Sequence, residues 1–349
     1  QSDSSTGLIL GSVKRMLDPC VYSRLILARK LQGVARDGAT NHSGGVMPDF
    51  ILHQYAGSPF SEKIRLLMGY LDLPSQQVEI PVIMPRPQLM PLTGGYRRTP
   101  VLQRGRETYC DTALIAKILI AQGAGQALLP QAQRAVIETV SYWADTFLFR
   151  VVVAVAFQPK ALSGNPLFAS DAEAAAFMAD RAEFSKGSTA LQMDLSVALS
   201  HFDLWLHQMN NQLGAQAFLF GAAPTLADFS VYHCLWFIAA RPALVAELAA
   251  FPEVMRWYAE MTAFGHGRVQ PMGAEAALQL ATAEPLLAKQ KILSPSVSVC
   301  PIDYGLQPVK GALVEAEHVP DAYSVLRDEP GVGELLVHFP RLGFSCVEL

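Results

Sequence analysis

The sequence has few cysteines, little charge and no long apolar run, and each shortage excludes a class of protein. Five cysteines are scattered over 349 residues, and no two of them have CxxC spacing. Neither a disulfide framework nor a cysteine-ligated zinc site is therefore predicted, and a reducing compartment is the simpler expectation. The eight histidines show no ligand spacing either, so we predict no metal site.

Charge and hydropathy exclude two kinds of partner. Charged residues make up 17% of the chain and the net charge is −4, whereas nucleic-acid-binding domains usually carry a basic excess. The best candidate for a membrane span, residues 147–157, is shorter than the required ~20 residues and contains Arg150. We therefore expect neither a nucleic-acid nor a membrane partner, and a content of 51% hydrophobic residues indicates a well-cored globular protein.

Residues 1–46 differ from the rest of the chain. They contain six basic and three acidic residues and end in the linker-like run Asn41-His42-Ser43-Gly44-Gly45. Three interpretations are open: a transit peptide, which would direct the protein to mitochondria, a translated upstream region, or a segment added by cloning. Without a transit peptide we expect a cytoplasmic protein. We leave this segment out of the fold prediction.

Residues 47–125 predict a small sheet with helices on its faces, in the order β-α-β-α-β-β-α. The apolar strand 50–54 breaks at Ala56-Gly57-Ser58-Pro59 and turns directly into an apolar-faced helix, 61–70. Such a turn presents free N–H groups and the positive end of the helix dipole, which together favour an anion. Strands at 77–83, 100–103 and 107–109, and a helix at 112–121, complete the prediction.

The remainder is predicted as an all-helical domain, residues 130–293, followed by a β-rich extension, residues 294–349. Helices are expected at 131–157, 166–184, 188–213, 224–240, 252–264 and 274–293. Thr225 and Asp228 have the spacing of a capping box, which predicts a structural role for both. Strands are expected at 297–299, 309–314, 334–339 and 344–347. Because the extension is small, we expect it to pack on the helical domain.

Four short motifs, in order along the chain, carry a family resemblance. They are Ser58-Pro59-Phe60-Ser61, Tyr96-Arg97-Arg98-Thr99-Pro100-Val101-Leu102, Asp111-Thr112, and Phe218-Leu219-Phe220-Gly221 followed by Thr225-Leu226-Ala227-Asp228. Together they resemble the glutathione transferase superfamily over residues 50–257, and the wording of several motifs resembles a divergent fungal-type branch with a C-terminal extension. The resemblance implies a thioredoxin-like domain, glutathione as co-substrate, a small hydrophobic second substrate and a homodimer.

The resemblance places Ser58 where the family's plant-type members carry a catalytic serine. A hydroxyl there would donate a hydrogen bond to the glutathione sulfur, worth about 1.5–3 kcal/mol and so roughly one to two pKa units. The structural alternative is that Ser58 only caps the following helix, although Ser61 is the better cap candidate. Tyr55 is the rival catalytic hydroxyl.

The same resemblance assigns glutathione contacts to Phe60, Arg98, Thr99, Pro100, Asp111 and Thr112. It implies a cis Thr99–Pro100 bond that presents the Thr99 backbone, Arg98 near the glycine carboxylate, and Thr112 at the γ-glutamyl carboxylate. Asp111 would face the γ-glutamyl ammonium, although it is one methylene shorter than the family's glutamate. A solvated loop for Arg98 and a plain N-cap for Asp111 are the structural alternatives. Cys110 is expected to be a core residue.

Tyr142, Trp143 and Phe147 are candidates for the second-substrate pocket, with core packing as their alternative. The predicted function is conjugation of the glutathione thiolate to a small apolar electrophile. A glutathione-dependent oxidoreductase is the first alternative, which Ser58 disfavours because serine cannot form a mixed disulfide. A non-catalytic interaction module and a pathway enzyme of secondary metabolism that adds or removes a thiol group are the others.

Overall fold

The computed structural model describes residues 50–349 except 123, 163–169 and 287–289. Residues 1–47 and 48–349 form separate units, and only the second is discussed below. The predictions for the leader 1–46 therefore lie outside the described residues, as does the start of the helix expected at 166–184.

The first domain forms a sheet around strand β1, whose two faces are both buried. Phe50 and Leu52 pack on one face with helices α3 and α5, whereas Ile51 packs on the other face near helix α4, as the alternation of a strand requires. Strand β1 pairs parallel with β2 and antiparallel with β3, and β3 and β4 form a hairpin. The elements are β1 (Phe50–Gln54), α3 (Pro59–Tyr70), β2 (Ser75–Glu79), α4 (Leu89–Thr93), β3 (Val101–Arg104), β4 (Glu107–Cys110), α5 (Thr112–Ile120) and the 3-10 helix η1 (Ala124–Leu128).

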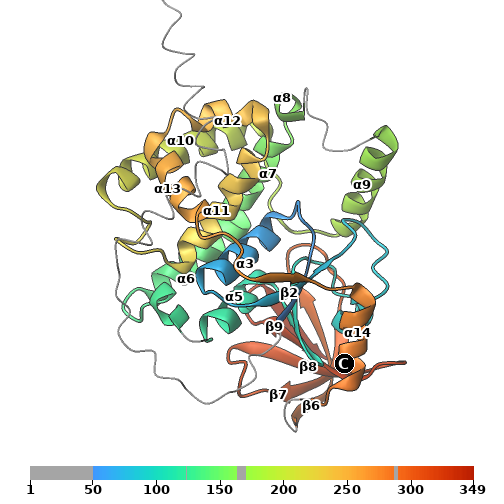
Figure 1. Ribbon diagram of the computed structural model, residues 1–349. Helices are drawn as coiled ribbons and strands as arrows, with labels where there is room; N and C mark the ends of the chain where they lie inside the picture. Colours follow the sequence, from blue (N-terminus) through green and yellow to red (C-terminus); the bar gives the residue numbers. More distant parts are fainter. Residues whose placement is uncertain (1–49, 123, 163–169, 287–289) are drawn as a thin grey trace, which may run out of the picture. The chain divides into compact units, whose positions relative to one another are not determined.

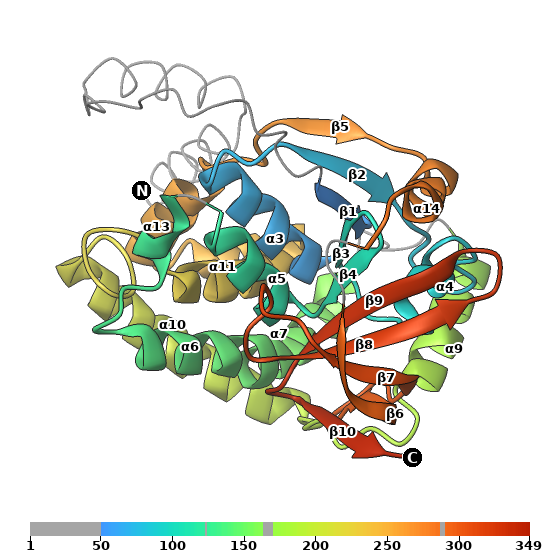
Figure 2. The same cartoon turned by 90° about the horizontal axis from the view of Figure 1, so that it is seen from below.

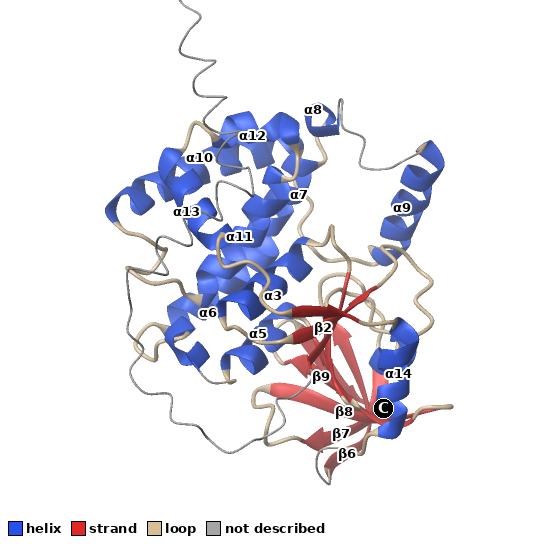
Figure 3. Cartoon of the chain, viewed as in Figure 1, coloured by secondary structure: helices blue, strands red, loops and turns tan. Residues whose placement is uncertain are grey.

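The second domain is helical, and its helices gather on one side of the sheet except α9, which lies apart from them (Figures 1 and 3). Its longest apolar run comprises α6, a π-helical segment η2 and α7, and packs against α10 and α11. By length and hydropathy the run Arg134–Ala156 would pass as a membrane span, which the sequence analysis did not predict. Val151, Val152 and Val155 of this run lie in the core, and 39% of its apolar window is buried, so packing accounts for part of its hydropathy. The elements are α6 (Arg134–Trp143), η2 (Ala144–Leu148), α7 (Phe149–Ala156), α8 (Pro159–Leu162), α9 (Asp171–Phe184), α10 (Leu195–Ala215), α11 (Leu226–Ala239), α12 (Pro242–Leu248) and α13 (Pro252–Thr262).

The C-terminal extension continues the sheet of the first domain, and it also contacts the helical domain, where the backbone N–H groups of Thr189 and Ala190 donate to the carbonyl oxygen of Asp303. Strand β9 lies parallel to β4, with Tyr109 opposite His338. The described residues thus form one sheet of ten strands in the order β10-β6-β7-β8-β9-β4-β3-β1-β2-β5 (Figure 2). The elements are β5 (Val269–Pro271), α14 (Ala274–Ala283), β6 (Lys291–Pro301), β7 (Val309–Glu315), β8 (Ala322–Glu329), β9 (Gly333–Pro340) and β10 (Phe344–Glu348).

Pairing of strands, which was not predicted, explains why the extension lies beside the first domain. Without a partner, β4 would be an edge with unpaired N–H and C=O groups, and β9 covers that edge. The β-branched and aromatic residues of the extension join Ile51, Val101 and Cys110 in one core cluster. The extension and the first domain therefore share their hydrophobic core.

Several elements differ from the sequence prediction, among them helices α8 and α12, which were not predicted. Strands β5 and β8 were not predicted. In β8 the polar end, Arg327-Asp328-Glu329, interrupts the alternation of apolar and polar residues that indicates a strand. Helix α10 begins at Leu195 rather than at 188. Helix α14 ends at Ala283 rather than at 293, because Pro285 disfavours helical backbone at Glu284.

Candidate functional site

A cavity of about 70 Å³ lies where the first domain, the helical domain and the extension meet. The first domain contributes Phe60 at the start of α3, the loop from Tyr96 to Pro100, and the start of α5. The helical domain contributes the junction of α6 and η2, and the extension contributes the loops after β6 and β9. Most of the residues that the resemblance assigns to glutathione therefore surround one cavity.

Ser58 caps α3 rather than lining this cavity. Its Oγ accepts a hydrogen bond from the backbone N–H of Ser61 at 3.2 Å, and its side chain is buried. Ser61, which the sequence favoured as the cap, lies inside the helix instead, and its buried Oγ has no hydrogen-bond partner. Tyr55 does not line the cavity either. The cap uses the oxygen of Ser58 as an acceptor, so its own hydroxyl hydrogen stays available as a donor.

The loop before β3 is fixed by a buried arginine. The Thr99–Pro100 peptide bond is cis, as the resemblance implies, and both residues line the cavity. The guanidinium of Arg86 donates to the carbonyl oxygen of Arg97 at 2.8 Å and to Thr99 Oγ1 at 2.9 Å. These bonds hold the loop that presents the Thr99 backbone.

Arg98 is engaged by the extension. Its guanidinium donates to the carboxylate of Asp303 and to the carbonyl oxygen of Tyr304, and lies 3.9 Å from the centroid of the Tyr304 ring. Its other nitrogen lies 3.9 Å from Asp111 Oδ2. The resemblance assigns the positive charge of Arg98 to the glycine carboxylate of glutathione, but here Asp303 of the same chain neutralises it.

Asp111 and Thr112 begin α5 at the floor of the cavity. Asp111 has φ 74° and ψ 136°, a left-handed conformation that a non-glycine residue rarely adopts, and such outliers cluster at functional sites. Its Oδ1 accepts from the N–H of Ala113 at 2.9 Å, so it is also the N-cap that the structural alternative predicted. Burial raises the pKa of Asp111, and the nearby Arg98 opposes that rise.

A buried ion pair joins the cavity to the helical domain. Lys63 donates to Asp145 at 2.5 Å and lies 3.4 Å from Thr112 Oγ1, and His233 Nε2 lies 3.0 Å from the other Asp145 oxygen. Lys63 is 1% exposed. Burial alone would raise the pKa of Asp145, but the charge of Lys63 and the hydrogen bond with His233 bring it below its ordinary value. Sequence reasoning missed Asp145, because nothing in the sequence pairs it with Lys63.

Of the three aromatic residues predicted for a substrate pocket, only Tyr142 lines the cavity. Trp143 stacks on Phe147 one helical turn away, and Phe147 contacts the ring of His201 on α10. Tyr142, Asp145 and Thr146 face the cavity at the junction of α6 and η2, whereas Trp143 and Phe147 lie on another face of the same helical run. Core packing is therefore the better interpretation for Trp143 and Phe147.

The extension supplies the groups that sequence reasoning left out of the site. Asp303 and Tyr304 follow β6, and Leu342, Gly343 and Phe344 follow β9. The Tyr304 ring lies between two guanidiniums, 3.9 Å from Arg98 and 4.5 Å from Arg150, and its edge meets Phe184. These cation–π contacts fix Tyr304 over the cavity. In the sequence the triplet Asp303-Tyr304-Gly305 separates two predicted strands and belongs to the motifs that resemble the divergent branch, but neither sign places it in the site.

None of the four cysteines within the described residues lines the cavity. Cys110 precedes Asp111 but is fully buried, as expected of a core residue, and burial raises the pKa of its thiol well above the ordinary value. A thiol of this kind is a poor nucleophile.

Thr225 and Asp228 form the capping box that their spacing predicts. Asp228 Oδ2 accepts from the backbone N–H of Thr225 at 2.8 Å, and its Oδ1 accepts from Trp257 Nε1 at 2.9 Å. Asp228 lies in the core, away from the cavity lining, which supports a structural role.

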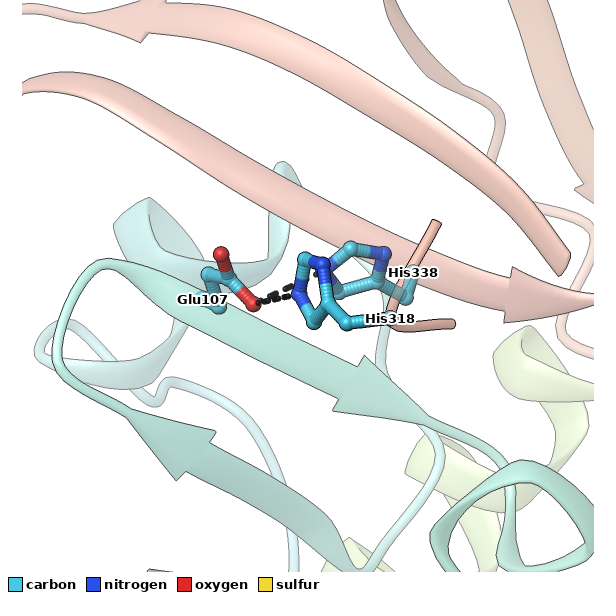
Figure 4. Close-up of side chains that lie close together, drawn as sticks. All are labelled: Glu107, His318 and His338. Carbon is cyan, nitrogen blue, oxygen red and sulfur yellow. Dashed lines mark hydrogen bonds and ion pairs between the residues drawn. The ribbon is translucent and has the colours of Figure 1, made fainter. Parts of the chain in front are cut away.

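A second constellation lies on the sheet, where none was predicted. Glu107, His318 and His338 converge from three segments, with their ligand atoms within 4.8 Å of one another (Figure 4). The spacing of the eight histidines gave no sign of it, because these three residues meet only through the pairing of β4 with β9.

Two family models match the chain: the glutathione S-transferase N-terminal domain over residues 52–127 and the C-terminal domain over residues 189–260. A GST-like protein from Pseudomonas syringae is 32% identical with a TM-score of 0.70, and the match covers 87% of this chain and 100% of that one. The chain therefore belongs to the glutathione S-transferase superfamily. Because 87% of the chain is matched, the P. syringae protein also covers part of the extension.

More distant structures share parts of the chain. A glutathione S-transferase from Methylobacillus flagellatus with glutathione bound is 18% identical with a TM-score of 0.44, and the match covers 62% of this chain and 97% of that one. A search of curated proteins found no match.

Proposed function

We propose that the chain is a glutathione-dependent transferase that conjugates the glutathione thiolate to a small apolar electrophile. One observation carries the proposal. The cis Thr99–Pro100 bond, Arg98 and the Asp111-Thr112 start of α5 meet around one cavity beside the N-terminus of α3. These elements are dispersed in sequence and are brought together by the fold of the first domain.

In this proposal glutathione lies across the first domain. The Thr112 hydroxyl and the free N–H groups of α5 bind the γ-glutamyl carboxylate, and Asp111 faces its ammonium. The Thr99 backbone pairs with the cysteinyl residue, and Phe60 lies beside it. Arg98 receives the glycine carboxylate in exchange for Asp303, since one carboxylate replaces another on the same guanidinium.

Ser58 then donates its hydroxyl hydrogen to the thiolate at the N-terminus of α3. A hydrogen bond to a charged group contributes about 1.5–3 kcal/mol, and the helix dipole contributes about 0.3–1 kcal/mol more. Starting from a thiol pKa of about 8.5, this suffices to populate the thiolate at neutral pH. The electrophile approaches from the side of Tyr142. Tyr55 remains the alternative donor.

The first test is titration of the purified chain with reduced glutathione, followed by turnover of a generic aryl halide. We expect saturable binding and glutathione-dependent conjugation. Absence of both binding and turnover would refute the proposal. The homodimer and the cytoplasmic location belong to the same proposal, and sedimentation equilibrium and cell fractionation test them.

A non-catalytic glutathione-binding module is a second candidate, favoured by the size of the cavity. About 70 Å³ is well below the ~300–1,000 Å³ of ordinary small-molecule sites, and Asp303 already occupies Arg98. Binding of glutathione without turnover of any electrophile would favour this candidate. A thiol oxidoreductase is disfavoured, because no cysteine of the described residues lines the cavity.

A further inference from the structure

Three side chains from distant segments converge on the sheet, away from the glutathione cavity. Glu107 begins β4, His338 lies on β9, and His318 belongs to the connection between β7 and β8 (Figure 4). The Nε2 atoms of His318 and His338 lie 2.8 Å and 3.4 Å from the same oxygen, Glu107 Oε2. Glu107 and His338 are fully buried, whereas His318 is 36% exposed.

These distances bring two imidazole nitrogens and one carboxylate oxygen close enough to share an ion, although the shorter of them, 2.8 Å, is also an ordinary hydrogen-bond length. The separation of 3.4 Å between His338 and Glu107 exceeds the ordinary N–H···O range of about 2.7–3.2 Å. In a tetrahedral site with metal–ligand bonds of about 2.0–2.1 Å, neighbouring donor atoms lie about 3.3–3.4 Å apart. The His338–Glu107 pair already has that spacing, and the His318–Glu107 pair would lengthen from 2.8 Å by about half an ångström to reach it.

The second carboxylate oxygen of Glu107 points away from the two imidazoles (Figure 4). Glu107 Oε1 is buried and has no hydrogen-bond partner within the described residues, whereas Oε2 also accepts from the hydroxyl of Tyr109 at 2.8 Å. A buried carboxylate oxygen without a partner is rare and requires an explanation such as an ion.

Neighbouring residues hold the imidazole of His338 in position. Ser324 Oγ lies 2.8 Å from His338 Nδ1. His338 can therefore donate its Nδ1–H to Ser324, which leaves Nε2 free as a metal ligand. Metal-binding histidines almost always have such a partner on the other ring nitrogen. The Tyr109 ring stacks on His338 at 4.8 Å and 15°, which fixes the plane of the imidazole.

We propose that Glu107, His318 and His338 bind a divalent transition-metal ion, and that Zn²⁺ is the ion that this donor set fits. Two imidazoles and one carboxylate are a known protein ligand set for zinc, with a water as fourth ligand. The exposed side of His318 is where solvent reaches the site. The ion would tie β4 of the first domain to β9 and to the β7–β8 connection, and so fasten the extension to the sheet.

The experiment uses the full chain, purified without a histidine tag and freed of metal by chelator and dialysis. Zn²⁺ is titrated by calorimetry, and Co²⁺ is titrated by its visible d–d absorption, which reports tetrahedral geometry. We expect one ion per chain and a melting temperature that rises with added Zn²⁺. No binding at one equivalent would overturn the proposal.

His318→Ala is the decisive variant, because this partly exposed residue is removed with little risk to folding. Loss of an outer partner weakens metal binding by ~10–100-fold, so loss of a ligand is expected to weaken it by more than that. His207→Ala, at an exposed histidine on α10, is the matched control and should bind like the wild type. Equal affinity in His318→Ala and the wild type would also overturn the proposal.

Ser324→Ala provides a second variant that retains all three ligands. We expect Zn²⁺ affinity to fall by ~10–100-fold. If the cluster were only a hydrogen-bonded network, His318→Ala and Ser324→Ala would lower the melting temperature equally with and without Zn²⁺. That result would contradict a metal site.

Discussion

Two of the three parts of the chain that line the cavity form walls that are built in different ways. The domain wall consists of Arg98, Thr99, Pro100, Asp111 and Thr112, and the extension wall consists of Asp303, Tyr304, Leu342, Gly343 and Phe344. Local features position most of the domain wall, such as the Asp111 cap on α5 and the bonds from Arg86. The extension wall comes from residues more than 200 positions further along the chain. The pairing of β9 with β4 brings them to the cavity.

The difference shows how an added segment can alter an inherited site. The domain wall contains the cation Arg98 and the N-terminus of α5, which both favour an anion. In the extension wall, Asp303 pairs with Arg98 and the ring of Tyr304 covers it. We infer that glutathione and the extension compete for Arg98. The predictions below test the two walls, beginning with the largest expected effect.

Deletion of residues 294–349 should prevent stable folding. The extension shares a core cluster with β1, β3 and the Tyr96 loop, and a single large-to-small core substitution costs about 2–5 kcal/mol. Loss of many such contacts exceeds the total stability of about 5–15 kcal/mol. Soluble yield and thermal melting measure the effect, with removal of the exposed Leu349 alone as control. A soluble truncated protein with a cooperative transition would contradict this prediction.

Asp145→Asn should destabilise the protein by about 3–5 kcal/mol near neutral pH, because it leaves Lys63 buried without its partner. The folded-state pKa of Asp145 is lowered, so its stabilisation is present above the unfolded value of about 3.9 and is lost as pH falls through the folded value. The variant should therefore lack part of the acid-induced loss of stability that the wild type shows.

Urea unfolding over a series of pH values measures this effect. Asp203→Asn, at an exposed carboxylate on α10, is the control and should change stability by less than about 1 kcal/mol. A stability of Asp145→Asn equal to that of the wild type would show that Lys63 finds another partner.

Ser58→Ala should lower kcat/KM for conjugation by roughly ten- to a hundredfold, the equivalent of about 1.5–3 kcal/mol. It should also cost about 1 kcal/mol of stability, because the cap on α3 is lost. Ser61→Ala is the control, since its hydroxyl has no partner, and should keep full activity. If Ser58→Ala were fully active and Tyr55→Phe were not, the catalytic hydroxyl would be that of Tyr55.

The sequence allowed the local parts of this account to be predicted. The turn at Ser58, the cap at Asp111 and the capping box at Thr225 each depend on residues within about four positions. The family resemblance added the cis bond before Pro100 and the two-domain architecture. Both kinds of information concern the first 260 residues.

The long-range parts could not be predicted. Arg98 and Asp303 are 205 residues apart, and Glu107 is 211 residues from His318 and 231 from His338. These pairs meet because β9 pairs with β4, and no periodicity within either strand identifies its partner. For the same reason Asp303 was not predicted as a site residue.

The most direct test measures glutathione affinity by calorimetry in the wild type, Asp303→Ala, Arg98→Ala and the double variant. The account predicts that Asp303→Ala binds glutathione about tenfold more tightly, the equivalent of about 1.4 kcal/mol, because Arg98 is released. Arg98→Ala should bind more weakly, and in that background removal of Asp303 should bring no gain. Unchanged or weaker binding by Asp303→Ala would contradict competition between the extension and glutathione for Arg98.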